Sequence, residues 1–449
     1  MSDTAATTSK PEAHFNGRGL PSNFPLDLAA LTAVISAVAV LYGGIRAFYF
    51  EGAFLEAFSY YSDERPFNEI INSLIGRDPE VTLFGIHAFG DYVIGNVWAS
   101  LDNPWLEAEI VNYLPPVLLL FSILGSLPYS VGLGVFFFAI VGATVAPMVV
   151  ASRGYPFAVR ILLVLLLAVM TGPALATFDR GNTQGLLPLV LFVFAVAVIK
   201  QRWGWAAAMI AIATAVKIYP VVLILVLIAL RRYQWAVVAV ALSAVSVVLT
   251  LPIVATGGLG SLGAVIEAVL QWQDRTIDDF LQYNVSFAGG VANAAYFLGL
   301  PGVGAWVANN AYLLIVVYAV LVMPVLWIRG IEVWIKVVVA LSLTTALMPI
   351  VYAYALNWVL AASAFAVWIT RRSSPDAVQG PWITRGLVLL LASGTAVLPV
   401  FIPGAMESGR PAGMVTFAAL GVYLTLPVVA YFSRRKQLAG HTSSPATTG

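Results

Sequence analysis

Long apolar runs separated by short polar turns make up most of the chain, and two much longer polar segments interrupt this pattern. Twelve runs approach the roughly 20 residues that a membrane-spanning helix needs. They lie near 28–45, 113–127, 130–150, 158–177, 184–199, 205–230, 234–254, 310–327, 333–349, 353–370, 384–402 and 413–432. The first run is too long and starts too late for a cleaved signal, so we expect it to remain as an anchor.

The two long polar segments cover about 49–112 and 255–309. Half of the 22 acidic side chains lie between Glu51 and Tyr113. Irregular polar segments of this length are usually functional, so we expect the first one to carry the catalytic face. Residues 1–26 and 433–449 are rich in Ser, Thr, Pro and Gly, which predicts disordered cytoplasmic tails around one transmembrane domain at 27–432.

Composition agrees with the pattern, because 60% of the residues are hydrophobic and only 10% are charged. A water-soluble core of this length could not bury so much apolar surface, which predicts an all-α polytopic membrane protein. Short cytoplasmic loops collect Lys and Arg, and this rule places both termini inside and both long polar segments outside. If each of the twelve runs crosses the membrane once, successive turns alternate between the two sides. Arg180 then lies inside, and three basic residues lie outside against the rule: Arg153, Lys200 and Arg202. The side of the turn from Asp179 to Gln184 therefore stays open.

The run from Phe89 to Trp98 places one carboxylate, Asp91, among aromatic and small residues. Such surroundings can raise the pKa of a carboxyl group and suit a general base. A solvated surface acid is the alternative, and Asp63 or Asp102 could hold the role instead. Four nearby aromatic residues could stack on sugar rings or form an interfacial belt: Tyr92, Trp98, Trp105 and Tyr113.

Two cations stand out farther along the chain. Lys217 lies within an apolar run, where a charge costs about 2.5 to 3.5 kcal/mol on insertion scales and marks a functional candidate. Its alternatives are an ion pair with Asp179, or snorkelling at a helix broken by Pro220. Arg180 precedes a polar turn. A lysine and an arginine near a membrane face suit a phosphate carried on a lipid.

Several chemistries are not expected. Without cysteine there is no disulfide or thiol chemistry, and His14, His87 and His441 have no metal-ligand spacing, so we expect no metal and no cofactor. The chain has no glycine-rich phosphate loop and no basic aromatic patch for nucleic acid.

Six short stretches follow one another between about 90 and 360: Gly90-Asp91-Tyr92, Asn112-Tyr113-Leu114-Pro115-Pro116, Arg180-Gly181-Asn182-Thr183-Gln184, Lys217-Ile218-Tyr219-Pro220, Asn284-Val285-Ser286-Phe287-Ala288-Gly289 and Pro349 to Trp358. In order and in placement relative to the apolar runs they resemble glycosyltransferase family 87. These are membrane enzymes of the GT-C fold that use polyprenyl-phosphate sugars. The chain departs from the family at three places. The Gly-Gln-x-Asn common in the family reads Gly181-Asn182-Thr183-Gln184 here, so the two amide residues are swapped, and Leu114 is inserted into the family's Tyr-Pro-Pro. Tyr354 and Ala355 stand where the family often has histidines.

The resemblance implies a twelve-span enzyme of the cytoplasmic membrane. It would transfer a sugar, with mannose favoured, from a polyprenyl-phosphate carrier to a hydroxyl of a glycolipid or envelope glycan on the outer face. Asp91 would be the base. The donor phosphate would be held by Lys217, Arg180, Asn182 and Gln184. The substrate contacts would come from Tyr92, Tyr113, Asn284, Ser286 and Tyr354.

Two alternatives remain at this point. The first is an arabinofuranosyltransferase that uses polyprenyl-phosphate arabinose, which the same motifs would serve. The second is a transporter or flippase of a lipid-linked sugar, with Lys217, Arg180 and Asp179 as intramembrane ion partners. Transporters keep their site near the membrane midplane, so two large acidic outer segments favour an enzyme.

Overall fold

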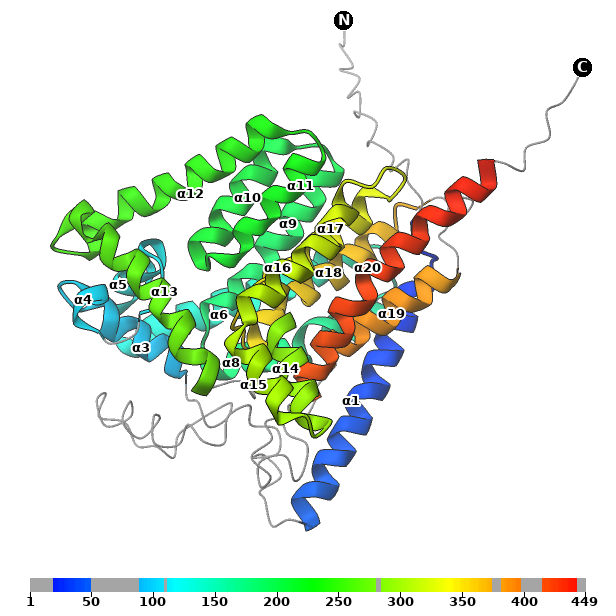
Figure 1. The fold of residues 1–449 in the computed structure, drawn as a ribbon, viewed down its shortest axis with the longest axis horizontal. Helices are drawn as coiled ribbons and strands as arrows, with labels where there is room; N and C mark the ends of the chain where they lie inside the picture. The colour runs from blue at the N-terminus through cyan, green and yellow to red at the C-terminus, as the bar shows by residue number, and fades with distance from the viewer. Residues whose placement is uncertain are drawn as a thin grey trace, which may run out of the picture.

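The computed structural model describes residues 19–49, 89–108, 111–279, 284–373, 381–396 and 414–441. Within these ranges the chain is helical and contains no β-strand, which confirms the all-α prediction (Figure 1). Asp63 lies outside the described residues, as do residues 1–18 and 442–449 of the predicted tails. Residues 24–26 and 433–441 of these tails belong to the helices Phe24–Tyr49 and Met414–His441.

The helices fall into three groups along the chain. The first contains α1 (Phe24–Tyr49), α3 (Gly90–Ala99), α4 (Pro104–Glu107), α5 (Pro115–Gly125), α6 (Tyr129–Ala151), α7 (Phe157–Val164), the π-helix η2 (Leu165–Val169) and α8 (Gly172–Arg180). The second contains η3 (Thr183–Leu186), α9 (Leu187–Ile199), α10 (Trp203–Val216), η4 (Tyr219–Leu223), α11 (Ile224–Ala229), α12 (Tyr233–Val254), η5 (Gly258–Ser261) and α13 (Leu262–Asp279). The third contains α14 (Phe287–Phe297), α15 (Pro301–Asn309), α16 (Ala311–Val322), η7 (Met323–Leu326), α17 (Val333–Ala346), η8 (Ala353–Leu356), α18 (Asn357–Thr370), α19 (Pro381–Thr395) and α20 (Met414–His441).

Three of the described helices are long and apolar enough to cross a membrane by themselves: α1, α6 and α12. Two bent pairs bring the number to five, namely α7 and η2 with α8, at 65°, and α15 with α16 and η7, at 81°. The other apolar helices have 10 to 17 residues. The chain is a membrane protein, and its described helices do not confirm the predicted count of twelve spans.

The centre of the bundle is formed by α17 and α18, in which 13 of the 14 residues of α17 and all 14 residues of α18 are buried. Trp334 and Trp358 are the largest of the fully buried side chains. Helices that present apolar residues on every side belong in a core surrounded by other helices. By contrast, only three of the 22 residues of α12 are buried, so its apolar surface is available to lipid.

The span predicted at 113–127 is wrong. Helix α5 has 11 residues, about 16 Å at 1.5 Å per residue, against a hydrocarbon core of about 30 Å. It lies along α3: the ring of Tyr113, just before α5, is 5.7 Å from that of Trp98, and Gly125 at its other end packs against Asn96.

The single span predicted at 205–230 is also wrong, because the chain reverses near its middle. Helix α10 ends at Val216, Lys217 and Ile218 form the turn, and η4 starts at Tyr219. Helix α11 then returns to the start of α10, where the guanidinium of Arg232 lies 4.6 Å from the ring centroid of Trp203. Lys217 therefore sits at a reversal between two short helices, not inside one long helix.

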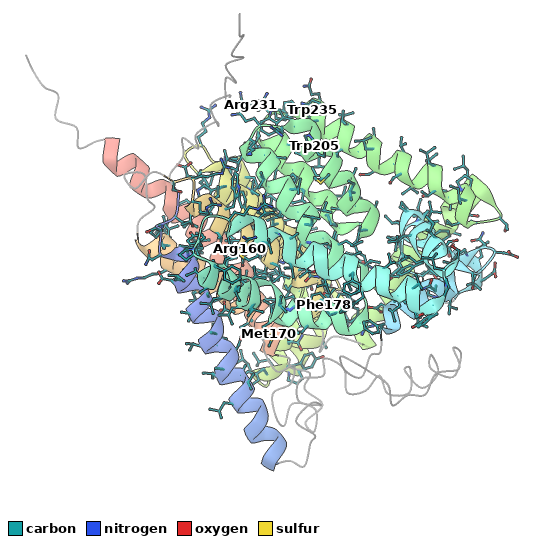
Figure 2. The ribbon with its side chains drawn as sticks, turned by 180° about the vertical axis from the view of Figure 1, so that it is seen from behind. Arg160, Met170, Phe178, Trp205, Arg231 and Trp235 are labelled. Atoms are coloured by element: carbon teal, nitrogen blue, oxygen red, sulfur yellow. The ribbon has the colours of Figure 1, made fainter. Side chains whose placement is uncertain are left out.

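These two changes alter the predicted sides of several turns. One end of the bundle holds the starts of α10 and α12, with Arg231, Trp205 and Trp235 close together (Figure 2). Helices α8 and α10 both end at the opposite end, where Arg180 bonds to Asp91. Arg180 therefore lies on the same side as Asp91. The prediction that placed Arg180 inside and Asp91 outside is wrong. The residues that broke the Lys and Arg rule, such as Arg202, move to the end that holds the other basic turns.

Candidate active site

The polar turn after α8 is shaped by its own side chains. Gly181 ends the helix at φ 60°, a left-handed conformation that favours glycine, and a Cβ atom there would approach the ring of Phe89 at 3.2 Å. Asn182 then accepts a 2.9 Å hydrogen bond at Oδ1 from the backbone N–H of Gln184, which starts η3. This turn directs the side chains of Arg180 and Asn182 to the same neighbour.

That neighbour is Asp91, in the first turn of α3. Arg180 donates from Nε to Oδ2 at 2.8 Å and from Nη2 to Oδ1 at 3.0 Å, and Asn182 Nδ2 donates to Oδ2 at 2.7 Å. The side chains of Asp91 and Arg180 are each 12% exposed. Such a two-bond pair between guanidinium and carboxylate is among the stronger polar contacts in proteins.

Burial alone would raise the pKa of Asp91, as the sequence led us to expect. The positive charge of Arg180 and the hydrogen bonds from Arg180 and Asn182 outweigh burial, so the pKa lies below the usual value. The expectation of a raised pKa is therefore wrong for this state of the protein. The carboxylate is ionised at neutral pH, and Oδ1 accepts one described hydrogen bond where Oδ2 accepts two.

Lys217 lies at the reversal between α10 and η4. Its Nζ donates to Asn112 Oδ1 at 3.3 Å and lies 4.1 Å from the ring centroid of Tyr113. The side chain of Asp179, the partner considered in the alternative ion pair, lies outside the described residues. Lys217 is thus held by an amide and an aromatic face from the segment that precedes α5.

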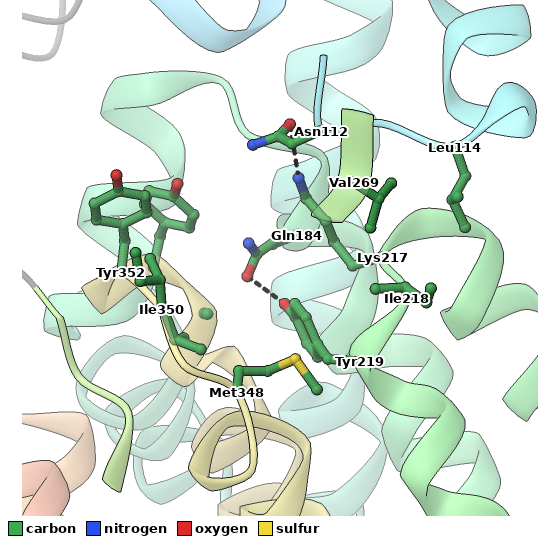
Figure 3. A pocket seen from close by; sticks show the side chains of 13 residues that line it. Asn112, Leu114, Gln184, Lys217, Ile218, Tyr219, Val269, Met348, Ile350 and Tyr352 are labelled. Atoms are coloured by element: carbon green, nitrogen blue, oxygen red, sulfur yellow. Dashed lines mark hydrogen bonds between the residues drawn. The ribbon is translucent and has the colours of Figure 1, made fainter. Parts of the chain in front are cut away.

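A cavity of about 60 Å³ opens beside Lys217 (Figure 3). Its polar lining residues are Asn112, Gln184, Lys217, Tyr219, Tyr352 and Tyr354. Its apolar lining residues include Leu114, Ile218, Val269, Met348 and Ile350. Lys217 is the only acidic or basic residue among the described lining residues. Burial lowers its pKa to about 7, and an anion bound beside it would favour its charged form. Figure 3 shows Leu114, Ile218 and Val269 together on one side of the Lys217 side chain, with Gln184 and Tyr352 on the other.

Gln184 is oriented by its neighbour Tyr219. The Tyr219 hydroxyl donates to Gln184 Oε1 at 2.6 Å, and this leaves the amide nitrogen of Gln184 turned toward the side where Tyr352 lies (Figure 3). The guanidinium carbon of Arg180 is 5.5 Å from the ring centroid of Tyr354, which lines the cavity. Tyr354 thereby connects the Asp91 and Arg180 pair with the cavity wall.

Of the five residues predicted to contact substrate, only Tyr354 lines this cavity; Tyr92, Tyr113, Asn284 and Ser286 do not. Tyr92 is 1% exposed and packs within a cluster of aromatic rings, with Phe136 at 5.2 Å. Asn284 and Ser286 are buried, and their side chains form hydrogen bonds with backbone groups.

The contacts of Asn284 fix the wall of the cavity. Its Nδ2 donates to the carbonyl of Pro349 at 2.6 Å, and its Oδ1 accepts from the N–H groups of Ser286 and Val351, both at 3.0 Å. Ser286 Oγ also donates to the Pro349 carbonyl at 3.2 Å. Ile350 and Val351 line the cavity, so Asn284 and Ser286 act on it through the backbone.

Two lining residues, Asn112 and Tyr219, received no role from the sequence. Both stand inside motifs that were recognised, beside Tyr113 and Lys217 respectively. Their place in these motifs was the one sign in the sequence that could have pointed to them. Their roles depend on contacts with distant residues: Asn112 bonds Lys217, 105 positions away, and Tyr219 bonds Gln184, 35 positions away.

A comparison with protein-family models matches residues 112–349, slightly more than half of the chain, to glycosyltransferase family 87. The chain belongs to this family. Searches of curated proteins and of solved structures gave no significant match. Membership makes the chain a membrane glycosyltransferase and sets the transporter alternative aside. The matched range contains Arg180, Lys217 and most of the cavity wall, and it begins after Asp91.

Proposed function

We propose that the cavity beside Lys217 binds the phosphate of a polyprenyl-phosphate sugar, from which the enzyme transfers the sugar to an acceptor hydroxyl. The observation that carries this proposal is the composition of the cavity lining. One cation, two side-chain amides and tyrosine hydroxyls favour an anion, and the described lining contains no carboxylate to oppose it. The apolar side with Leu114 and Ile218 suits the first units of a prenyl chain.

We propose Asp91 as the general base. The acceptor oxygen attacks the anomeric carbon, the bond from that carbon to the phosphate oxygen breaks, and the polyprenyl phosphate leaves with the electron pair. The acceptor proton passes to Asp91 Oδ1, which has a lone pair beyond its bond to Arg180. As the donor phosphate attracts Arg180, the carboxylate loses part of its partner's charge, and its pKa and basicity rise.

The remaining site residues follow from this arrangement. Arg180 and Lys217 would stabilise the charge on the departing phosphate, with hydrogen bonds from Gln184 and from Tyr354 at the place where the family often has histidine. Asn182 would hold Asp91 in position.

The membrane side and the sugar belong to the proposal too. The basic turns lie at the end of the bundle opposite the site, which supports an extracytoplasmic site in the cytoplasmic membrane by the Lys and Arg rule. The family resemblance favours mannose as the sugar and a glycolipid or envelope glycan as the acceptor. A polyprenyl-phosphate arabinose donor is the alternative.

The test is a donor panel with the purified full-length protein in lipid nanodiscs and an envelope glycolipid extract as acceptor. Polyprenyl-phosphate mannose and arabinose are compared with the corresponding sugar nucleotides. Transfer from one polyprenyl-phosphate sugar, with an increased donor KM for Lys217→Met, is expected. Transfer from a sugar nucleotide alone would contradict the proposal, and the preferred polyprenyl donor decides between the two sugars.

A further inference from the structure

The surroundings of the Lys217 ammonium contain a residue whose role the donor site does not yet explain. Tyr113 is 2% exposed and presents its ring to Lys217 Nζ at 4.1 Å. The ring is fixed from behind, because Trp98 packs against it at 5.7 Å and Trp105 Nε1 donates to the Tyr113 carbonyl at 3.2 Å. Asn112 accepts from the same ammonium at 3.3 Å.

The direction of Tyr113 separates it from the cavity. Asn112 and Leu114 both line the cavity, whereas Tyr113 between them does not. Neighbouring side chains in an extended segment point to opposite sides, and Leu114 has extended backbone angles of φ −77° and ψ 157°. The leucine that separates Tyr113 from Pro115 therefore faces the cavity while the tyrosine faces the protein. Tyr113 is buried too deeply to stack on a sugar ring.

We infer that Tyr113 is a positioning residue: the face of its ring, together with the Asn112 carbonyl oxygen, holds the Lys217 ammonium at the edge of the cavity for the donor phosphate. This inference rests on the proposed donor site. It gives Tyr113 a role that differs from the substrate contact expected from the sequence.

The ring, and not the hydroxyl, carries the effect. An aromatic face attracts a cation within about 6 Å through its quadrupole, and the attraction grows when water is excluded. Burial and the charge of Asp91 raise the pKa of Tyr113, so the phenol is neutral and offers no counter-charge of its own. Phenylalanine should therefore replace Tyr113 with little loss, whereas leucine should not.

The experiment is a double-mutant cycle on the full-length enzyme, with donor KM and kcat measured for each variant. Tyr113→Leu is expected to raise the donor KM by about 3- to 30-fold, and Tyr113→Phe to change it by less than about twofold. Combined with Lys217→Met, Tyr113→Leu should add nothing further. The control is Phe136→Leu, a buried ring of the same aromatic cluster that should leave the donor KM unchanged.

The outcomes are distinguishable. If Lys217→Met raises the donor KM and Tyr113→Leu multiplies that effect, Tyr113 acts independently and the inference is overturned while the donor site stands. If Tyr113→Phe is as damaging as Tyr113→Leu, the hydroxyl is the active group and the inference is likewise overturned. If Lys217→Met leaves the donor KM unchanged, the donor site and the inference fail together.

A second set of variants avoids any loss of volume at this buried position. Phenylalanine analogues with increasing ring fluorination at position 113 keep the shape of the ring and weaken its negative face. The donor KM should rise stepwise with fluorination. A constant donor KM across the series overturns the inference even if Tyr113→Leu does not fold.

Discussion

The buried ion pair between Asp91 and Arg180 should dominate the attachment of α3 to α8. At the 2.8 Å separation of Nε and Oδ2, and with an effective dielectric constant near 20, the gross attraction is about 6 kcal/mol. Burial of the two charges offsets part of this. Arg180→Met leaves a buried carboxylate with Asn182 as its remaining described partner, so the free energy of unfolding should fall by about 3 to 5 kcal/mol.

The double variant Asp91→Asn with Arg180→Met removes both charges and should lose less stability than Arg180→Met alone. The assay is denaturant unfolding of the purified proteins in micelles, followed by tryptophan fluorescence. The control is Arg202→Met, an exposed cation at the opposite end of the bundle, with an expected change within about 0.5 kcal/mol. A loss below about 1 kcal/mol for Arg180→Met, or a double variant that loses the sum of the two single losses, would refute the reasoning.

Three further predictions address the pH response, the cavity wall and the orientation. Because the pKa of Asp91 is lowered on folding, its contribution to stability should be complete above about pH 4, the range of a free aspartic acid, and lost as the pH falls through the folded pKa; acid titration of unfolding measures this, and a loss centred near pH 6 would contradict it. Asn284→Ala removes three hydrogen bonds that hold the wall, so unfolding should become easier by about 2 to 4 kcal/mol and donor KM should rise; an unchanged KM in folded protein would show that the wall does not depend on Asn284. A cysteine at Ser100 should react with an impermeant maleimide on intact cells and one at Gln234 only after lysis, and the reverse labelling would invert the orientation.

The sequence singled out Asp91, Arg180 and Asn182 by their motifs, and the structure brings them together from distant positions. Asp91 and Arg180 are 89 residues apart, and no spacing rule connects them. The contacts of Asp91 with Arg180 and Asn182 also change its expected pKa. An isolated carboxylate among aromatic residues predicts a raised pKa, whereas the pKa of Asp91 is lowered. Only the position of Arg180 reveals that the charge partner outweighs burial.

Hydropathy could not find the reversal at Lys217, because the residues on both sides are equally apolar. Two signals were present in the chain. A single helix over 205–230 would be about 39 Å long, more than the roughly 30 Å that the hydrocarbon core requires. Pro220 also suits the first turn of a new helix better than the interior of a long one. The role of Asn284 had no comparable signal, since the wall residues that it bonds, Pro349 and Val351, are more than 60 residues away.

The central claim is that Asp91 accepts the acceptor's proton while Lys217 and Arg180 hold the donor phosphate. The most direct measurement is single-turnover sugar transfer by Asp91→Asn, with donor affinity determined on the same samples and Asp102→Asn, an exposed carboxylate before α4, as the control. We predict that Asp91→Asn slows transfer by about 100- to 10,000-fold with donor affinity nearly unchanged, and that Asp102→Asn transfers at close to the wild-type rate. Transfer by Asp91→Asn at a near wild-type rate, or a loss confined to Asp102→Asn, would contradict the account.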